Sequence, residues 1–193
     1  MAGESVSFSD VDVSIPGQSG TAPTRSVYGW ILIHKHDIQE IFDWNLNWAS
    51  YRDGFGDRHF NFWFGLEKVH RLTDAQPYRL RVEMRDIDSG DWFSVQYSYF
   101  HVGPESDGYR LDVSGYNGDA VNALQYEGNL LDGMKFSTND RDYDLASFYD
   151  CASEYKGGWW YNDCREANLC CEHEHWWHGH YLDYSLMLIK PQS

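Results

Sequence analysis

The chain has 193 residues, enough for one domain with a sizeable core. Its 30 acidic and 15 basic side chains give a formal net charge of −15, which argues against nucleic acid or an anionic membrane surface as partner. No run of about eighteen apolar residues occurs, so insertion into a membrane is not expected.

Residues 1–26 are predicted to form a divergent or disordered tail. They are rich in Ser, Gly, Pro and Thr, and they show neither the basic start nor the apolar stretch of a signal peptide. The folded domain is therefore expected to cover residues 27–193.

Within this domain, apolar residues recur first at the spacing of a helix and then at the spacing of a strand. Asp37 is the expected N-cap of a helix whose apolar face includes Ile41 and Tyr51, and a second short helix is expected at 66–72. Apolar residues then alternate with polar ones over 78–84, 93–99 and 109–113, with a turn at 88–90 between the first two runs. This order predicts an α+β fold: a central antiparallel β-sheet with short helices over 27–131, then a loop-rich subdomain over 132–193.

Three carboxylates at alternate positions mark the start of the loop-rich part. Asp140, Asp142 and Asp144 repel one another unless a cation or a hydrogen-bonded turn compensates their charge. Oxygen ligands in a loop suit Ca²⁺, but the spacing does not fit an EF-hand, because Leu145 stands where that loop needs glycine. A calcium site and a solvated acidic turn both remain open from spacing alone.

All four cysteines lie in the last quarter of the chain. Cys151 and Cys164 enclose a short segment that contains Gly157, Gly158 and an aromatic run at 159–161. The even count favours disulfides, although reduced thiols remain an alternative. The aromatic run fits either a stapled core turn or the wall of a binding site.

The stretch CCEHEHWWHGH at 170–180 offers six cysteine and histidine side chains as metal ligands. It does not match the helical His-Glu-x-x-His pattern of zinc enzymes, and in an extended chain His173 and His175 face away from His178 and His180. A zinc enzyme that uses this stretch is therefore only a third hypothesis, ranked after two hypotheses of a binding function. Cys170 and Cys171 can pair, stay reduced or bridge to another chain.

An ordered series of short blocks resembles the fibrinogen C-terminal domain, in particular its ficolin and tachylectin type. The similarity runs from about residue 28 to residue 191. The blocks are YRDGFG at 51–56, NFWFGL at 61–66, VHRLT at 69–73, YRLRV at 78–82, FSTNDRDYD at 136–144, GGWWY at 157–161, YSL at 184–186 and IKP at 189–191.

This resemblance implies a calcium ion held by the carboxylates of Asp142 and Asp144 and by the main-chain oxygens of Ala146 and Phe148. It also implies a disulfide between Cys151 and Cys164. In the lectin members a pocket for acetyl groups lies beside the second cysteine, where a cis peptide shapes it. The corresponding ligand-binding candidates are Trp160, Tyr161, Asp163, Cys164, Arg165 and, in the adjoining stretch, His173.

The implied function is that of a secreted, non-enzymatic recognition module of innate immunity, which binds acetylated glycans in a calcium-dependent manner. The alternative is an extracellular module that binds a protein such as a receptor, matrix or fibrin-like partner. Homo-oligomerisation in a full-length protein is compatible with both. The chain departs from the family pattern at several points: it has no cysteine before Cys151 to form the family's amino-terminal disulfide, Cys170-Cys171 replaces the usual Asn-Gly, and the segment that follows is shorter.

Overall fold

The central sheet is built from strands whose side chains alternate between core and solvent. The structure is a computed structural model, and it describes residues 9–14, 21–27, 29–172 and 175–192. Strand β6 shows the principle, because Leu80, Val82 and Met84 are fully buried while Arg81 and Glu83 between them are partly exposed.

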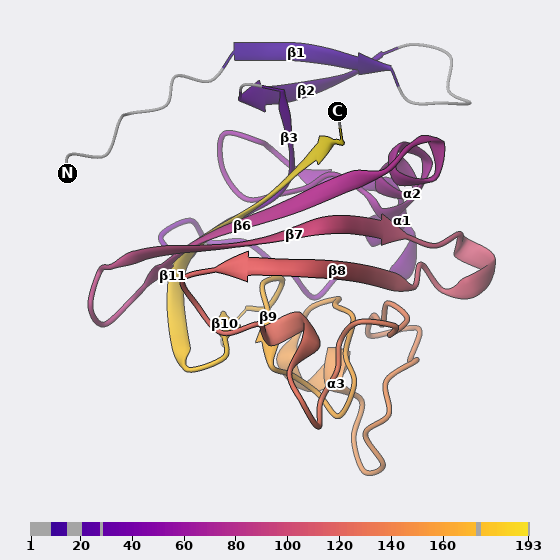
Figure 1. The fold of residues 1–193 in the computed structure, drawn as a ribbon. Helices are drawn as coiled ribbons and strands as arrows, with labels where there is room; N and C mark the ends of the chain where they lie inside the picture. The colour runs from indigo at the N-terminus through magenta and orange to yellow at the C-terminus, as the bar shows by residue number, and fades with distance from the viewer. Residues whose placement is uncertain (1–8, 15–20, 28, 173–174, 193) are drawn as a thin grey trace.

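Most of the helices and strands are short (Figure 1). They are β1 (Ser9–Ser14), β2 (Thr21–Val27), β3 (Trp30–Asp37), α1 (Trp48–Asp53), β4 (Phe55–Gly56), β5 (Phe62–Trp63), α2 (Leu66–Ala75), β6 (Tyr78–Asp86), β7 (Trp92–Val102), β8 (Leu111–Gly118), α3 (Cys151–Tyr155), β9 (Ala167–Asn168), β10 (Trp176–Trp177) and β11 (His180–Pro191), with single 3₁₀ turns at Glu105–Asp107 and Ala123–Gln125.

The main strands pair in the order β1-β2-β3-β11-β6-β7-β8, and every pair is antiparallel. The last strand of the chain, β11, therefore lies in the middle of the sheet, between β3 and β6 (Figure 1). The segment of residues 119–172, red to orange in Figure 1, is mostly loops and gathers beside β8, the edge strand of the sheet. These features confirm the predicted α+β class with a central antiparallel sheet.

The N-terminal segment differs from its prediction as a tail. Residues Ser9–Ser14 and Thr21–Val27 pair as antiparallel strands, and β2 continues the sheet through two residue pairs with β3. The alternation of Asp and Val at 10–13 is the strand signal that the Ser, Gly and Pro content of this segment obscured.

The first predicted helix is wrong over most of its length. Asp37 ends β3 instead of capping a helix, and Asn61 holds the following turn by donating to the carbonyl oxygen of Glu40 at 3.0 Å. Helix α1 begins only at Trp48, after Asn47, whose side chain accepts from the Ser50 amide. Two features outweigh the apolar spacing: Asn47 caps the helix at a later position, and residues 30–37 pair with the sheet. The second helix is confirmed and extends to Ala75.

One continuous aromatic core joins the sheet to the loop-rich part. Phe136 packs against Tyr51 and Trp63 from the first part and against Trp160 from the second, at ring-centroid distances of 5.0–5.8 Å. The amide of Gly158 donates to the Tyr51 hydroxyl at 2.8 Å. The two predicted subdomains therefore share their interior.

Candidate functional site

The aspartate loop is held in shape by its own carboxylates. The Asp142 side chain accepts from the Asp144 amide at 2.9 Å. Both carboxylate oxygens of Asp144 are engaged, one by the Ala146 amide at 2.9 Å and the other by the Cys151 amide at 2.8 Å. Asp140 instead ties the loop to helix α1, because it accepts from the Trp48 amide and from the Thr138 hydroxyl.

The electrostatics of this loop leave negative charge uncompensated. Burial raises the pKa of the Asp144 carboxyl, and the neighbouring negative charge of Asp142 raises it further. A divalent cation between the two carboxylates would remove this repulsion, and hard oxygen donors of this kind fit Ca²⁺. Among the described residues, no hydrogen bond occupies the carbonyl oxygens of Ala146 and Phe148, which are the two further ligands that the family resemblance implies.

A disulfide closes the segment behind this loop. Cys151, the first residue of α3, is joined to Cys164, as the resemblance implies. The peptide bonds on both sides of Cys164 are trans, which corrects the expected cis bond, and Cys164 itself adopts a left-handed φ of 50°. The glycine pair allows a close approach of two backbone segments, because a Cβ on Gly157 would lie 1.5 Å from the Cys170 carbonyl oxygen.

Two of the expected ligand-contacting aromatics belong to the core. Trp160 is 1% exposed and donates to the Tyr109 carbonyl, while Tyr161 is fully buried and donates to the Gly157 carbonyl. Neither side chain can line an open pocket as it stands. Their spacing beside a cysteine gave no sign of this, because large aromatics serve cores and binding walls equally well.

The surface beside the disulfide is made by other side chains. The Arg165 guanidinium lies 4.7 Å from the ring centre of Tyr155 and 5.2 Å from that of Trp176, so it fills the space between the two rings. Trp176 in turn contacts the half-exposed Tyr181 edge to face at 4.8 Å. Asp163 is exposed, and Cys164 is almost fully buried.

The histidines of the 170–180 stretch point to different partners. His175 is buried, hydrogen-bonded to Ser185 and stacked on His36, whereas His178 bonds to Glu166 and His180 to Asp86. No three metal-binding groups of this stretch converge within the part that the structure describes, so a zinc cluster here finds no support. His173 lies outside the described residues.

The two adjacent cysteines are reduced and buried. The Cys170 sulfur lies 3.5 Å from the Nδ1 of His34, and the Cys171 thiol contacts the Asn168 carbonyl. Because both side chains are fully buried, neither is placed to bridge to another chain.

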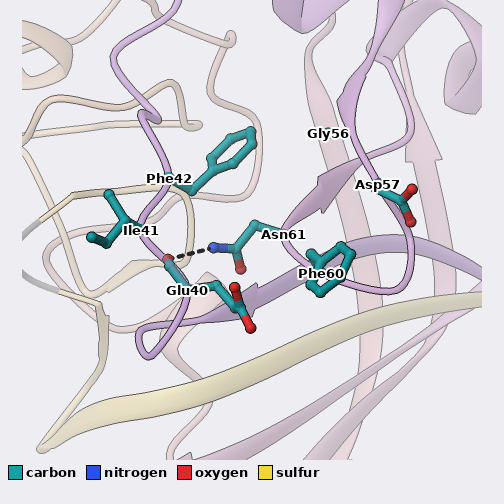
Figure 2. A pocket seen from close by; sticks show the side chains of 7 residues that line it. All are labelled: Glu40, Ile41, Phe42, Gly56, Asp57, Phe60 and Asn61. Carbon is teal, nitrogen blue, oxygen red and sulfur yellow. Dashed lines mark hydrogen bonds between the residues drawn. The ribbon is translucent and has the colours of Figure 1, made fainter.

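A pocket that the sequence did not indicate lies between the 38–47 loop and the 56–61 loop. Figure 2 shows its seven lining residues, and the cavity holds about 400 Å³. Ile41 is fully exposed and Phe60 is 54% exposed, while the carboxylates of Glu40 and Asp57 are exposed at its edge. The predicted helix concealed this site, since it placed Ile41 on a buried face.

Further apolar side chains are exposed on the aspartate loop itself. Leu145 is 64% and Phe148 is 94% exposed, and Tyr149 beside them is about half exposed. Isolated exposed apolar residues are ordinary, but three within five positions next to a proposed ion site form a surface suited to contact with a partner.

The fold, the disulfide and the aspartate loop together define a fibrinogen-like globular domain. The model of the family "Fibrinogen beta and gamma chains, C-terminal globular domain" matches residues 24–185, so the chain belongs to this family. In the described residues, no helix is long and apolar enough to cross a membrane.

Known proteins place the chain in the same group. It is 39% identical to Protein scabrous of Drosophila melanogaster over 141 residues, which cover 73% of this chain but 17% of that protein. The fibrinogen-like globe domain of human ANGPTL2 superposes with a TM-score of 0.85 at 29% identity, over 98% of this chain and 95% of that one. A lamprey fibrin D-dimer, solved with the peptide ligand Gly-His-Arg-Pro-amide, gives 0.78 at 28% identity over 89% and 65%.

Proposed function

We propose that the chain is an extracellular, non-enzymatic recognition domain that binds a protein ligand through the pocket of Figure 2. The observation that carries this proposal is the exposure of Ile41 and Phe60 at a cavity of about 400 Å³ whose edge carries the carboxylates of Glu40 and Asp57. Apolar side chains at a concave surface gain most from being covered by a partner.

The chemistry of the pocket selects the ligand. An apolar side chain of the ligand would fill the space beside Phe42 and Phe60, and a neighbouring Lys or Arg would meet Glu40 or Asp57. The net charge of −15 favours approach of such a basic segment over a wide distance. The lamprey fibrin relative, solved with a peptide that contains arginine, supports peptide recognition as a use of this fold.

An extracellular setting agrees with the rest of the chain. The relatives are secreted or extracellular proteins, and the disulfide between Cys151 and Cys164 persists best in an oxidising compartment. Calcium, held by Asp142, Asp144 and the carbonyl oxygens of Ala146 and Phe148, would stabilise the loop that presents Leu145 and Phe148 to a partner.

Calcium-dependent binding of acetylated glycans is the second candidate. The observation in its favour is the aromatic surface of Trp176 and Tyr181 beside Cys164, because an apolar sugar face stacks well on such rings. Against it, Trp160 and Tyr161 are buried and Arg165 occupies the space between Tyr155 and Trp176.

The two candidates separate in one experiment. The purified domain is applied in calcium to an array of extracellular protein domains and to an array of acetylated glycans. We expect protein hits that are lost in Phe60→Ser but kept in Ile87→Ser, which changes an equally half-exposed apolar residue outside the pocket. Hits that survive Phe60→Ser would overturn the pocket assignment. Glycan hits that free N-acetylglucosamine and a chelator both abolish would favour the lectin instead.

A further inference from the structure

Helix α2 and strand β7 bring three metal-binding side chains together. His70 and Asp74 are one helical turn apart on α2, and His101 lies near the end of β7. One ligand atom from each residue lies within 4.8 Å of the other two. Among the described residues, this is the one such group of three.

The surrounding contacts orient two of the three ligands. The Nδ1 of His70 lies 2.9 Å from the Val102 carbonyl oxygen, so with its proton on Nδ1 this ring carries its free lone pair on Nε2. A backbone acceptor on the second ring nitrogen is the usual partner of a metal-bound histidine. The His101 Nε2 lies 3.9 Å from the Asp74 carboxylate. The imidazole rings of His70 and His101 stand nearly perpendicular, with their centroids 6.4 Å apart.

The helix and the strand are already fixed to each other at this point. The Val102 amide donates to the Thr73 hydroxyl at 3.2 Å, and Thr73 lies between His70 and Asp74 in the sequence. The positions of the three Cα atoms are therefore set by the fold. The Asp74 side chain is 70% exposed and is free to change rotamer, whereas the His101 side chain is only a quarter exposed.

Two imidazoles and one carboxylate select a different ion from the calcium proposed for the aspartate loop. Nitrogen ligands suit Zn²⁺, which in proteins takes His and Asp or Glu at about 2.0–2.2 Å, whereas Ca²⁺ takes oxygen ligands. At these bond lengths, two ligand atoms of a tetrahedral site stand about 3.4 Å apart. A small rotamer change of Asp74 is therefore needed to bring its carboxylate closer to the two histidines. Three protein ligands leave the fourth position to water.

We propose that His70, Asp74 and His101 form a Zn²⁺ site that clamps helix α2 to strand β7. The site is independent of ligand recognition at the pocket of Figure 2 and of calcium at the aspartate loop. It is partly exposed, so water or a donor atom of a bound partner can take the fourth coordination position.

The proposal is tested by titrating the purified domain with Zn²⁺ in saturating Ca²⁺, which keeps the carboxylates of the aspartate loop occupied. Isothermal calorimetry measures the number of ions and the affinity, and Co²⁺ in place of Zn²⁺ reports a tetrahedral site by its visible absorption. We expect one ion per chain in the parent, and an affinity at least about tenfold lower in His101→Ala. His59→Ala, which removes an exposed histidine outside the group, is the matched control and is expected to bind as the parent does.

Two results would overturn the assignment. One is a parent that binds no Zn²⁺ under these conditions. The other is a His101→Ala variant that binds as tightly as the parent, which would place the ion elsewhere, for example in the stretch 173–180. Circular dichroism of His101→Ala confirms that a loss of binding is not a loss of fold, and Asp74→Asn, at a mostly exposed position, provides an independent second variant.

Discussion

Three buried histidines surround one buried serine in the middle of the sheet. The Ser185 hydroxyl on β11 lies 3.2 Å from a ring nitrogen of His34 and 2.7 Å from one of His175. His36 stacks on His175 at 4.1 Å, and its Nδ1 bonds to the Leu169 carbonyl. Burial lowers the pKa of all three rings, so they are neutral in the folded protein at neutral pH.

This cluster predicts that the domain loses stability in mild acid. Burial lowers the pKa of His36 to about 4, against an ordinary value of 6.5, although the Leu169 carbonyl and the charge of Asp37 partly oppose it. Between these two pH values the unfolded chain binds a proton that the folded one does not. The free energy of unfolding therefore falls as the pH drops from about 6.5 to about 4, by roughly 3 kcal/mol for His36 alone.

Urea unfolding at a series of pH values measures this slope, and His36→Leu should flatten it. The comparison with the parent matters, because the raised pKa of Asp144 contributes a slope of the opposite sign that both proteins share. His34 and His175 keep part of the slope in the variant. Equal slopes in the parent and in His36→Leu would show that His36 does not carry the effect.

At the residue scale, the local pattern and the family resemblance indicate contacts between residues that are near in sequence. Asp142 and Asp144 lie close along the chain and interact, which leaves their role as calcium ligands a prediction, and the disulfide between Cys151 and Cys164 that the family resemblance implies is present. The same reasoning could not tell that Trp160 is buried or that His175 faces His36, because those contacts join residues far apart in sequence.

At the scale of elements, the disulfide links the start of α3 to the loop after the aromatic run. It closes a segment with a sequence separation of 13, and the amide of Cys151 also holds the Asp144 carboxylate. Cross-linking a loop of this size limits the unfolded chain, which stabilises the folded state by about 3 kcal/mol in the chain-entropy account.

The double substitution Cys151→Ser with Cys164→Ser should therefore lower the free energy of unfolding by about 3 kcal/mol, measured by chemical denaturation. A reductant provides the control: it should lower the stability of the parent and leave the variant unchanged, because Cys170 and Cys171 are already free thiols. A variant as stable as the parent would mean that core packing alone holds this segment.

Elements with strong alternation were predicted well, and elements fixed by distant partners were not. The alternation of apolar and polar residues predicts strands β6 and β7, which pair with each other. Strand β6 also pairs with β11, which comes from the far end of the chain. The expected helix from Asp37 fails because residues 30–37 pair with β11, a partner about 150 positions away that local spacing cannot reveal.

At the scale of the whole molecule, the shared aromatic core predicts a single unfolding transition. Phe136 and Trp160 from the loop-rich part pack on Tyr51 and Trp63 from the sheet part, so neither part keeps its interior if the other unfolds. Any ion that binds the folded aspartate loop must then stabilise the entire domain.

Calcium is accordingly expected to raise the melting temperature of one cooperative transition. At a concentration a hundred times its dissociation constant, a ligand of the folded state adds about 2.7 kcal/mol, which is about 5–10 °C for a chain of this size. Asp144→Asn should abolish this rise, and its own calcium-free melting temperature is the baseline, because asparagine keeps only one of the two backbone hydrogen bonds that the Asp144 carboxylate accepts. Asp112→Asn, at an exposed position on β8, should respond to calcium as the parent does.

Scanning calorimetry with and without calcium measures these melting temperatures. Two separate transitions would contradict the shared core, and a calcium shift that persists in Asp144→Asn would place the ion outside the aspartate loop.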